Sequence, residues 1–96
     1  MLLDGNLLTE VEPGAFLGLE NVTQLYLSNN RIRTVAPFTA LRKLEILDLG
    51  GNHMTELPNN TFAGLYHLTK LQLQFNKITS LRTQTFADLR VSHSIL

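Results

Sequence analysis

The sequence contains no cysteine. That absence excludes disulfide bonds and thiolate chemistry, and it leaves the redox compartment undecided. Long apolar runs are also missing, so no segment approaches the about 20 residues that a membrane-spanning helix needs. The opening residues, MLLDGNLL, have neither a basic start nor a sustained apolar stretch, so they do not predict a signal peptide.

The chain has no excess of charge of either sign, because eight Lys and Arg balance eight Asp and Glu among its 96 residues. A neutral chain gives no electrostatic reason to expect nucleic acid or an anionic membrane as a partner. We therefore expect neither nucleic-acid binding nor direct membrane insertion of this segment.

A regular series of asparagines is the most informative feature of the sequence. Asn6, Asn30, Asn52 and Asn76 are separated by 24, 22 and 24 residues. Around each, the chain follows the unit L-x-x-L-x-L-x-x-N-x-I-x-x-L and then F-x-x-L, with the first copy lacking its opening leucine. Self-similarity at this period predicts a repeat architecture. We divide the single domain 1–96 into repeats 1–21, 22–43, 44–67 and 68–91, with 92–96 beginning a fifth strand.

Each repeat contains one short predicted strand. In L-x-L, alternation sends Leu25 and Leu27 to one face and Tyr26 to the other. One such strand cannot bury its apolar face alone, whereas stacked copies cover one another and form a parallel sheet. The chain must then turn a corner inside the stack, where its backbone groups cannot reach water.

Two side-chain ladders follow from this stacking. An asparagine side chain carries both donors and an acceptor, so it can satisfy the buried backbone at the corner. The predicted corner ladder consists of Asn6, Asn30, Asn52 and Asn76. A second ladder of large flat side chains should fill the width of the coil. It consists of Phe16, Phe38, Phe62 and Phe86.

The repeat resembles the leucine-rich repeat family, and the 24-residue spacing with Leu57-Pro58 resembles its typical, mostly extracellular class. The resemblance implies an α/β-type solenoid. It would be a right-handed coil with a short parallel β-sheet on the concave face and irregular or short helical convex segments. Extracellular members usually have cysteine-rich caps, which this chain lacks. We therefore expect a fragment of a longer horseshoe, able to self-associate through its uncapped ends.

The sequence offers no catalytic constellation. His53, His67 and His93 fall at different repeat positions without a second ligand at metal spacing, so they indicate surface histidines. No serine has a G-x-S-x-G context, and no lysine follows Gly50-Gly51 at P-loop spacing. We expect no enzyme activity, no cofactor and no metal.

Two sequons could carry N-linked glycans. They are Asn21-Val22-Thr23 and Asn59-Asn60-Thr61, and neither has proline in the middle. Asn21 precedes a predicted strand and Asn59 lies on the outer return segment, so both should be accessible.

The predicted function is non-enzymatic protein binding through the concave face. The outward strand positions proposed to contact a protein ligand are Gln24, Tyr26, Ile46, Asp48, Lys70, Gln72, Gln74 and Phe75. Tyr26, Ile46 and Phe75 are aromatic or apolar where solubility favours polar residues, which is typical of binding anchors. The resemblance places the chain in an extracellular adhesion, matrix, guidance or innate-immune recognition protein. The alternative is a cytosolic scaffold or enzyme-regulating repeat protein.

Overall fold

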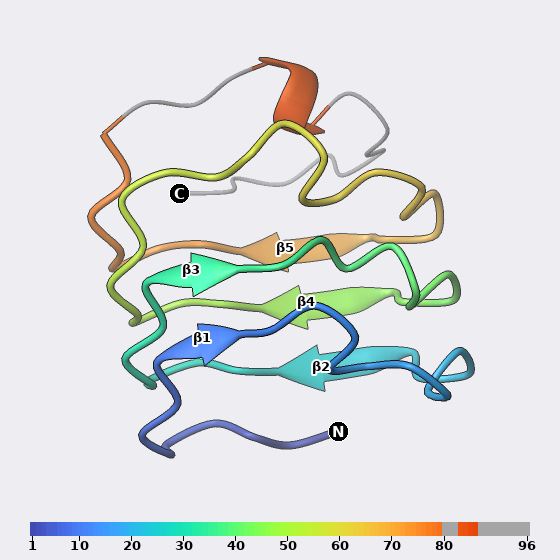
Figure 1. Cartoon of the computed structure of the whole chain (residues 1–96), viewed down its shortest axis with the longest axis horizontal. Coiled ribbons are helices and arrows are strands. Elements are labelled where there is room, and N and C mark those ends of the chain that lie inside the picture. Colours follow the sequence, from blue (N-terminus) through green and yellow to red (C-terminus); the bar gives the residue numbers. More distant parts are fainter. Residues whose placement is uncertain (80–82, 87–96) are drawn as a thin grey trace.

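A three-stranded parallel sheet runs along one side of the protein. The computed structural model describes residues 1–79 and 83–86. The sheet is formed in the order β2 (Gln24–Tyr26), β4 (Ile46–Asp48) and β5 (Lys70–Gln72). Figure 1 shows these strands stacked one above the other, and in this view the return segments of the chain pass in front of them. Leu2 extends the sheet by an isolated parallel bridge to Tyr26.

The leucines between the outward-facing strand residues form the core. In the sheet Leu25 pairs with Leu47 and Leu47 with Leu71, so equivalent positions of successive repeats are neighbours. All three side chains are buried, as are Leu27, Leu49 and Leu73 two residues later. Burying these side chains against the next turn supplies the main stabilisation, about 1.5–3 kcal/mol for each.

A second, two-stranded sheet lies on the return side, where only irregular or short helical segments were expected. Here β1 (Glu10–Val11) pairs in parallel with β3 (Thr34–Val35), and Val11 and Val35 point into the core. The Ala36 N–H donates to the Val11 carbonyl at 2.8 Å. The equivalent residue of the next repeat is Pro58, which has no N–H, so the same hydrogen bond cannot form there.

The corner after each strand is held by an asparagine. Asn52 donates from Nδ2 to the carbonyls of Leu49, in its own turn, and Leu27, in the preceding turn, at 3.0 and 3.1 Å. Its Oδ1 accepts the Ile32 N–H at 3.1 Å. Asn30 and Asn76 make the same three kinds of contact one turn before and one turn after. Asn6 is exposed, and among the described residues its side chain donates within its own turn alone, to the carbonyls of Leu3 and Asp4.

The phenylalanines form a continuous stack. Ring centroids lie 5.9 Å apart between Phe16 and Phe38, 6.1 Å between Phe38 and Phe62, and 5.9 Å between Phe62 and Phe86. The second repeat is two residues shorter between its asparagine and phenylalanine, yet Phe38 keeps its place in the stack. The shortening is accommodated near Pro37, where a groove of about 240 Å³ opens on the return side.

Within the described residues there is no α-helix, and one 3-10 helix, η1, spans Thr83–Phe86. The solenoid-like stacking of short parallel strands therefore agrees with the expected architecture, and the right-handed sense of the coil stays a prediction. The expected fifth strand at 92–96 and His93 lie outside the described residues.

The first turn leaves apolar side chains exposed. Met1, Leu2 and Leu7 are 44, 76 and 69% accessible. Met1 lines, together with Leu8, a partly apolar groove of about 400 Å³ at this end of the coil. Self-association through this surface stays a prediction.

Candidate functional site

Six of the predicted ligand-binding residues form one small surface. The strand register aligns Gln24, Ile46 and Lys70 in one row, and Tyr26, Asp48 and Gln72 in a second row. We call these six residues the outer sheet face. None is fully buried, because their side chains point away from the leucine core. Residues 22 to 24 positions apart in the sequence thus become direct neighbours.

The outer sheet face combines an apolar strip with polar groups of both charges. Leu2, 76% exposed, lies beside Tyr26 through its bridge, so the second row begins with an apolar and an aromatic side chain. The Tyr26 hydroxyl donates to Gln24 Oε1 at 3.2 Å. Asp48 Oδ1 accepts the Gly50 N–H at 3.0 Å, which fixes this carboxylate against the end of its strand.

Phe75 lies at the corner that follows β5, and not within the strand as the pattern suggested. Its φ is +61°, a left-handed conformation that is costly for a bulky side chain. The equivalent residues of the other repeats are Gly5, Asn29 and Gly51, which also have positive φ. Phe75 is 86% exposed, so no burial within the described residues offsets this strain. An exposed, strained aromatic residue points to a use outside the chain itself.

Gln74 completes the predicted set at the end of the sheet. Its carbonyl accepts the Gly51 N–H at 2.9 Å. Its Nε2 and Asp48 Oδ1 each lie 3.3 Å from where a Cβ of Gly50 would be, so these two side chains cover that glycine. Gln74 therefore joins Phe75 to the outer sheet face.

The family model for leucine-rich repeats matches residues 1–54 and 42–93 of the sequence. The chain belongs to the leucine-rich repeat family. Leucine-rich repeat domains generally mediate protein–protein binding, and the family is typically a non-enzymatic binding module. A search of curated proteins finds no match to this chain.

The two sequons of this leucine-rich repeat chain lie away from the outer sheet face. Asn21 precedes β2, is exposed, and accepts a hydrogen bond from Lys43 Nζ at 3.0 Å. Asn59 is exposed on the return side, whereas Thr61 of the same sequon is buried and donates from Oγ1 to the Pro58 carbonyl at 2.7 Å.

His53 and His67 are exposed, in agreement with their interpretation as surface residues. In the described part of the chain, no group of three or more His, Cys, Asp or Glu is arranged to hold a metal ion. Searched over the same residues, no helix has the length and apolar character to span a membrane.

One surface was missed by sequence reasoning. A groove of about 600 Å³ lies at the edge where the chain leaves the asparagine corners, and Arg31, His53 and Lys77 line it together with four other residues. The repeat alignment contained the signal, because each of these three residues directly follows a ladder asparagine. The balanced charge of the whole chain conceals this local cluster.

Proposed function

We propose that this leucine-rich repeat chain binds a protein ligand through the outer sheet face, extended at its edge by Gln74 and Phe75. In the expected coil this surface is the concave face. The observation that carries the proposal is Phe75, an aromatic side chain that is both strained and 86% exposed. Aromatic residues surrounded by polar groups are the usual centres of binding energy in protein interfaces.

The proposed binding surface is smaller than a standard protein interface. A standard interface involves about 20–30 residues on each side. The outer sheet face with Leu2, Gln74 and Phe75 comprises nine residues. It therefore forms part of a larger site, which further turns of a longer coil would complete by extending the same rows.

We further propose an extracellular or cell-surface setting, in an adhesion, matrix, guidance or innate-immune recognition protein. The 24-residue repeat and the exposed Asn21 and Asn59 support it. The alternative is a cytosolic scaffold or enzyme regulator, with which the absence of cysteine is compatible.

Expression of the full-length protein in a secretory cell line separates these two settings. We expect the protein to reach the medium or cell surface and to lose mass on treatment with a glycosidase that removes N-linked glycans. The mass loss should fall by one glycan in each of the Asn21→Gln and Asn59→Gln variants. A protein that remains in the cytosol without glycans would favour the scaffold.

Substitution of the aromatic residues tests the binding surface. In the full-length protein, Tyr26→Ala and Phe75→Asn should each weaken affinity for the protein partner by about 2 kcal/mol, because each removes a large anchoring side chain. Phe75→Asn should also raise the free energy of unfolding by about 1 kcal/mol, since asparagine tolerates a positive φ. Titration calorimetry and urea denaturation measure the two effects.

Tyr66→Ala is the matched control, because Tyr66 is 57% exposed but lies outside the sheets. The Tyr66→Ala variant should bind the protein partner with the same affinity as the parent protein. If Tyr66→Ala loses affinity while the Tyr26 and Phe75 variants bind normally, the partner uses another face and the proposal is wrong.

A further inference from the structure

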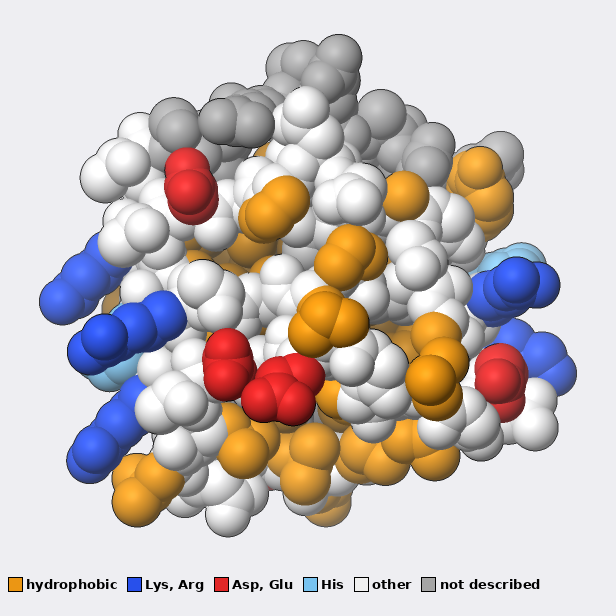
Figure 2. Space-filling view, viewed as in Figure 1, with side chains coloured by type: hydrophobic (Ala, Val, Ile, Leu, Met, Phe, Trp, Pro, Cys, Tyr) orange, Lys and Arg blue, Asp and Glu red, His pale blue; other side chains and the backbone are white. Residues whose placement is uncertain are grey.

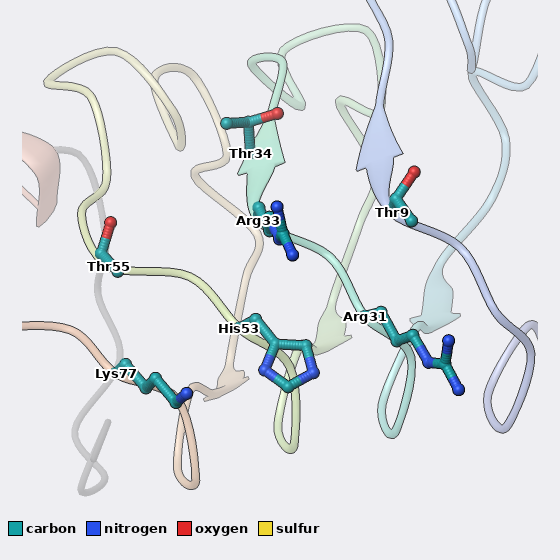
Figure 3. Close-up of a pocket in the computed structure, with 7 residues that line it drawn as sticks. All are labelled: Thr9, Arg31, Arg33, Thr34, His53, Thr55 and Lys77. Carbon is teal, nitrogen blue, oxygen red and sulfur yellow. The ribbon is translucent and has the colours of Figure 1, made fainter.

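The groove at the edge of the coil has an unusual lining. It is formed by Thr9, Arg31, Arg33, Thr34, His53, Thr55 and Lys77. Among the residues that the structure describes, no Asp or Glu and no aliphatic side chain lines it. Figure 3 shows the cationic and hydroxyl side chains coming from neighbouring turns of the chain. Figure 2 shows that Lys and Arg gather at the left and right edges of the molecule.

The backbone explains why these side chains share one surface. In Arg31-Ile32-Arg33 the isoleucine is buried, so alternation directs both arginines outward. The same holds for His53 and Thr55 on either side of Met54. Neighbouring segments are joined by hydrogen bonds, from Arg31 N to Leu8 O at 2.8 Å, from His53 N to Ile32 O at 2.9 Å, and from Lys77 N to Met54 O at 2.9 Å.

These hydrogen bonds hold four segments, one from each successive turn, side by side as in a parallel sheet. Equivalent residues should therefore be spaced by about 4.8 Å along the stack. Arg31, His53 and Lys77 then form a column of nitrogen-bearing side chains that crosses three turns, with Arg33 and Thr55 in a parallel column. Such a surface can contact an extended chain at several successive points.

The cations in the groove have no neutralising partner in the described part of the chain. Arg31, Arg33 and Lys77 are exposed, and within the described residues no carboxylate forms an ion pair with them. Six Lys and Arg belong to the described part of the chain, and three of them line this one groove. Although the whole chain is neutral, this edge is therefore locally positive.

The lining also selects among anionic partners. Single-stranded nucleic acid usually stacks its bases on Phe, Tyr or Trp side chains, and among the described residues none of these three types lines the groove. A peptide ligand is usually anchored by apolar side chains in apolar pockets, and these are absent as well. The groups that line the groove are guanidinium and ammonium groups, which bind anionic oxygens, and threonine hydroxyls, which form hydrogen bonds with uncharged oxygens.

We propose that this groove binds a sulfated polysaccharide, with Arg31, Arg33 and Lys77 contacting sulfate groups and Thr9, Thr34 and Thr55 contacting sugar hydroxyls. The site is separate from the outer sheet face and does not depend on the protein-binding function proposed for it. One protein molecule can bind the polysaccharide and the protein ligand at the same time, because the groove lies beyond the ends of the strands.

The double variant Arg31→Gln/Arg33→Gln tests the site. It keeps both side chains polar and able to donate hydrogen bonds but removes two charges. Binding of a heparin hexasaccharide to the full-length protein should weaken about tenfold, as expected when charge-assisted contacts at an exposed site are lost. Binding by the parent should weaken as salt is added. Thermal unfolding should not change, because both side chains are exposed.

Arg42→Gln/Lys43→Gln is the matched control. Like the test variant it removes two positive charges, but from exposed positions that do not line the groove. The control should bind the hexasaccharide like the parent protein. An equal loss of affinity in both double variants would show attraction to net charge alone and would overturn the site. Equally tight binding of a polyglutamate peptide or a single-stranded oligonucleotide would overturn the assignment to a polysaccharide.

Discussion

Phe38→Ala should lower the free energy of unfolding by about 3–5 kcal/mol, among the largest losses expected from one substitution in this chain. The Phe38 ring is fully buried and stacks on two others, Phe16 at 5.9 Å and Phe62 at 6.1 Å. Alanine leaves a cavity in the middle of the stack, and the short second repeat has no spare residues with which to close it. Urea denaturation followed by circular dichroism measures the loss.

Phe16→Ala provides the internal comparison. Phe16 is only partly buried and stacks on a single ring within the described residues, that of Phe38. Its replacement should cost about half as much, because less area is buried and solvent can fill the space. If both substitutions cost the same, the stack does not act as a continuous core element.

Asn52→Ala should lower the free energy of unfolding by about 3 kcal/mol, near the upper end of the cost of an unsatisfied buried polar group. Asn52 is 3% exposed. Its side chain accepts the Ile32 N–H and donates to the carbonyls of Leu27 and Leu49. Alanine satisfies none of them, and no water reaches a corner buried between turns. Besides the denaturation midpoint, faster exchange of the Ile32 amide proton should report the loss.

Two further variants sharpen this test. Asn6→Ala should cost less than about 1 kcal/mol, because Asn6 is exposed and its carbonyl partners can bond to water. Asn52→Asp keeps an acceptor for Ile32 but replaces the donor with an oxygen that faces three carbonyls, so it should destabilise at least as much as alanine. A corner unaffected by both Asn52 substitutions would contradict the hydrogen-bonding role.

The repeat pattern determined the core and its register. Alternation in L-x-L and the spacing of the asparagines were sufficient to predict that Leu25, Leu47 and Leu71 are neighbours in a parallel sheet. The reason is that a repeat can bury its apolar side chains only against an identical neighbour, so equivalent positions must align. The same reasoning placed the asparagine corner and the phenylalanine stack.

Two features were decided by tertiary structure. The pairing of β1 with β3 depends on the lateral fit of two return segments, and two-residue strands such as Glu10–Val11 have no sequence signature of their own. The left-handed conformation of Phe75 is likewise imposed by the corner, since phenylalanine by itself disfavours a positive φ. In both cases contacts between turns override local preference.

The two candidate binding surfaces also differ in whether the sequence or the tertiary structure determined them. The sequence by itself determined which side chains point outward from the strands, because alternation and repeat register are local and periodic properties. Only the tertiary structure decided how the corner segments assemble into a basic groove, with Arg31, His53 and Lys77 from three turns on one edge. Their grouping depends on hydrogen bonds between those turns, and residues 22 to 24 positions apart become a surface only after the coil has formed.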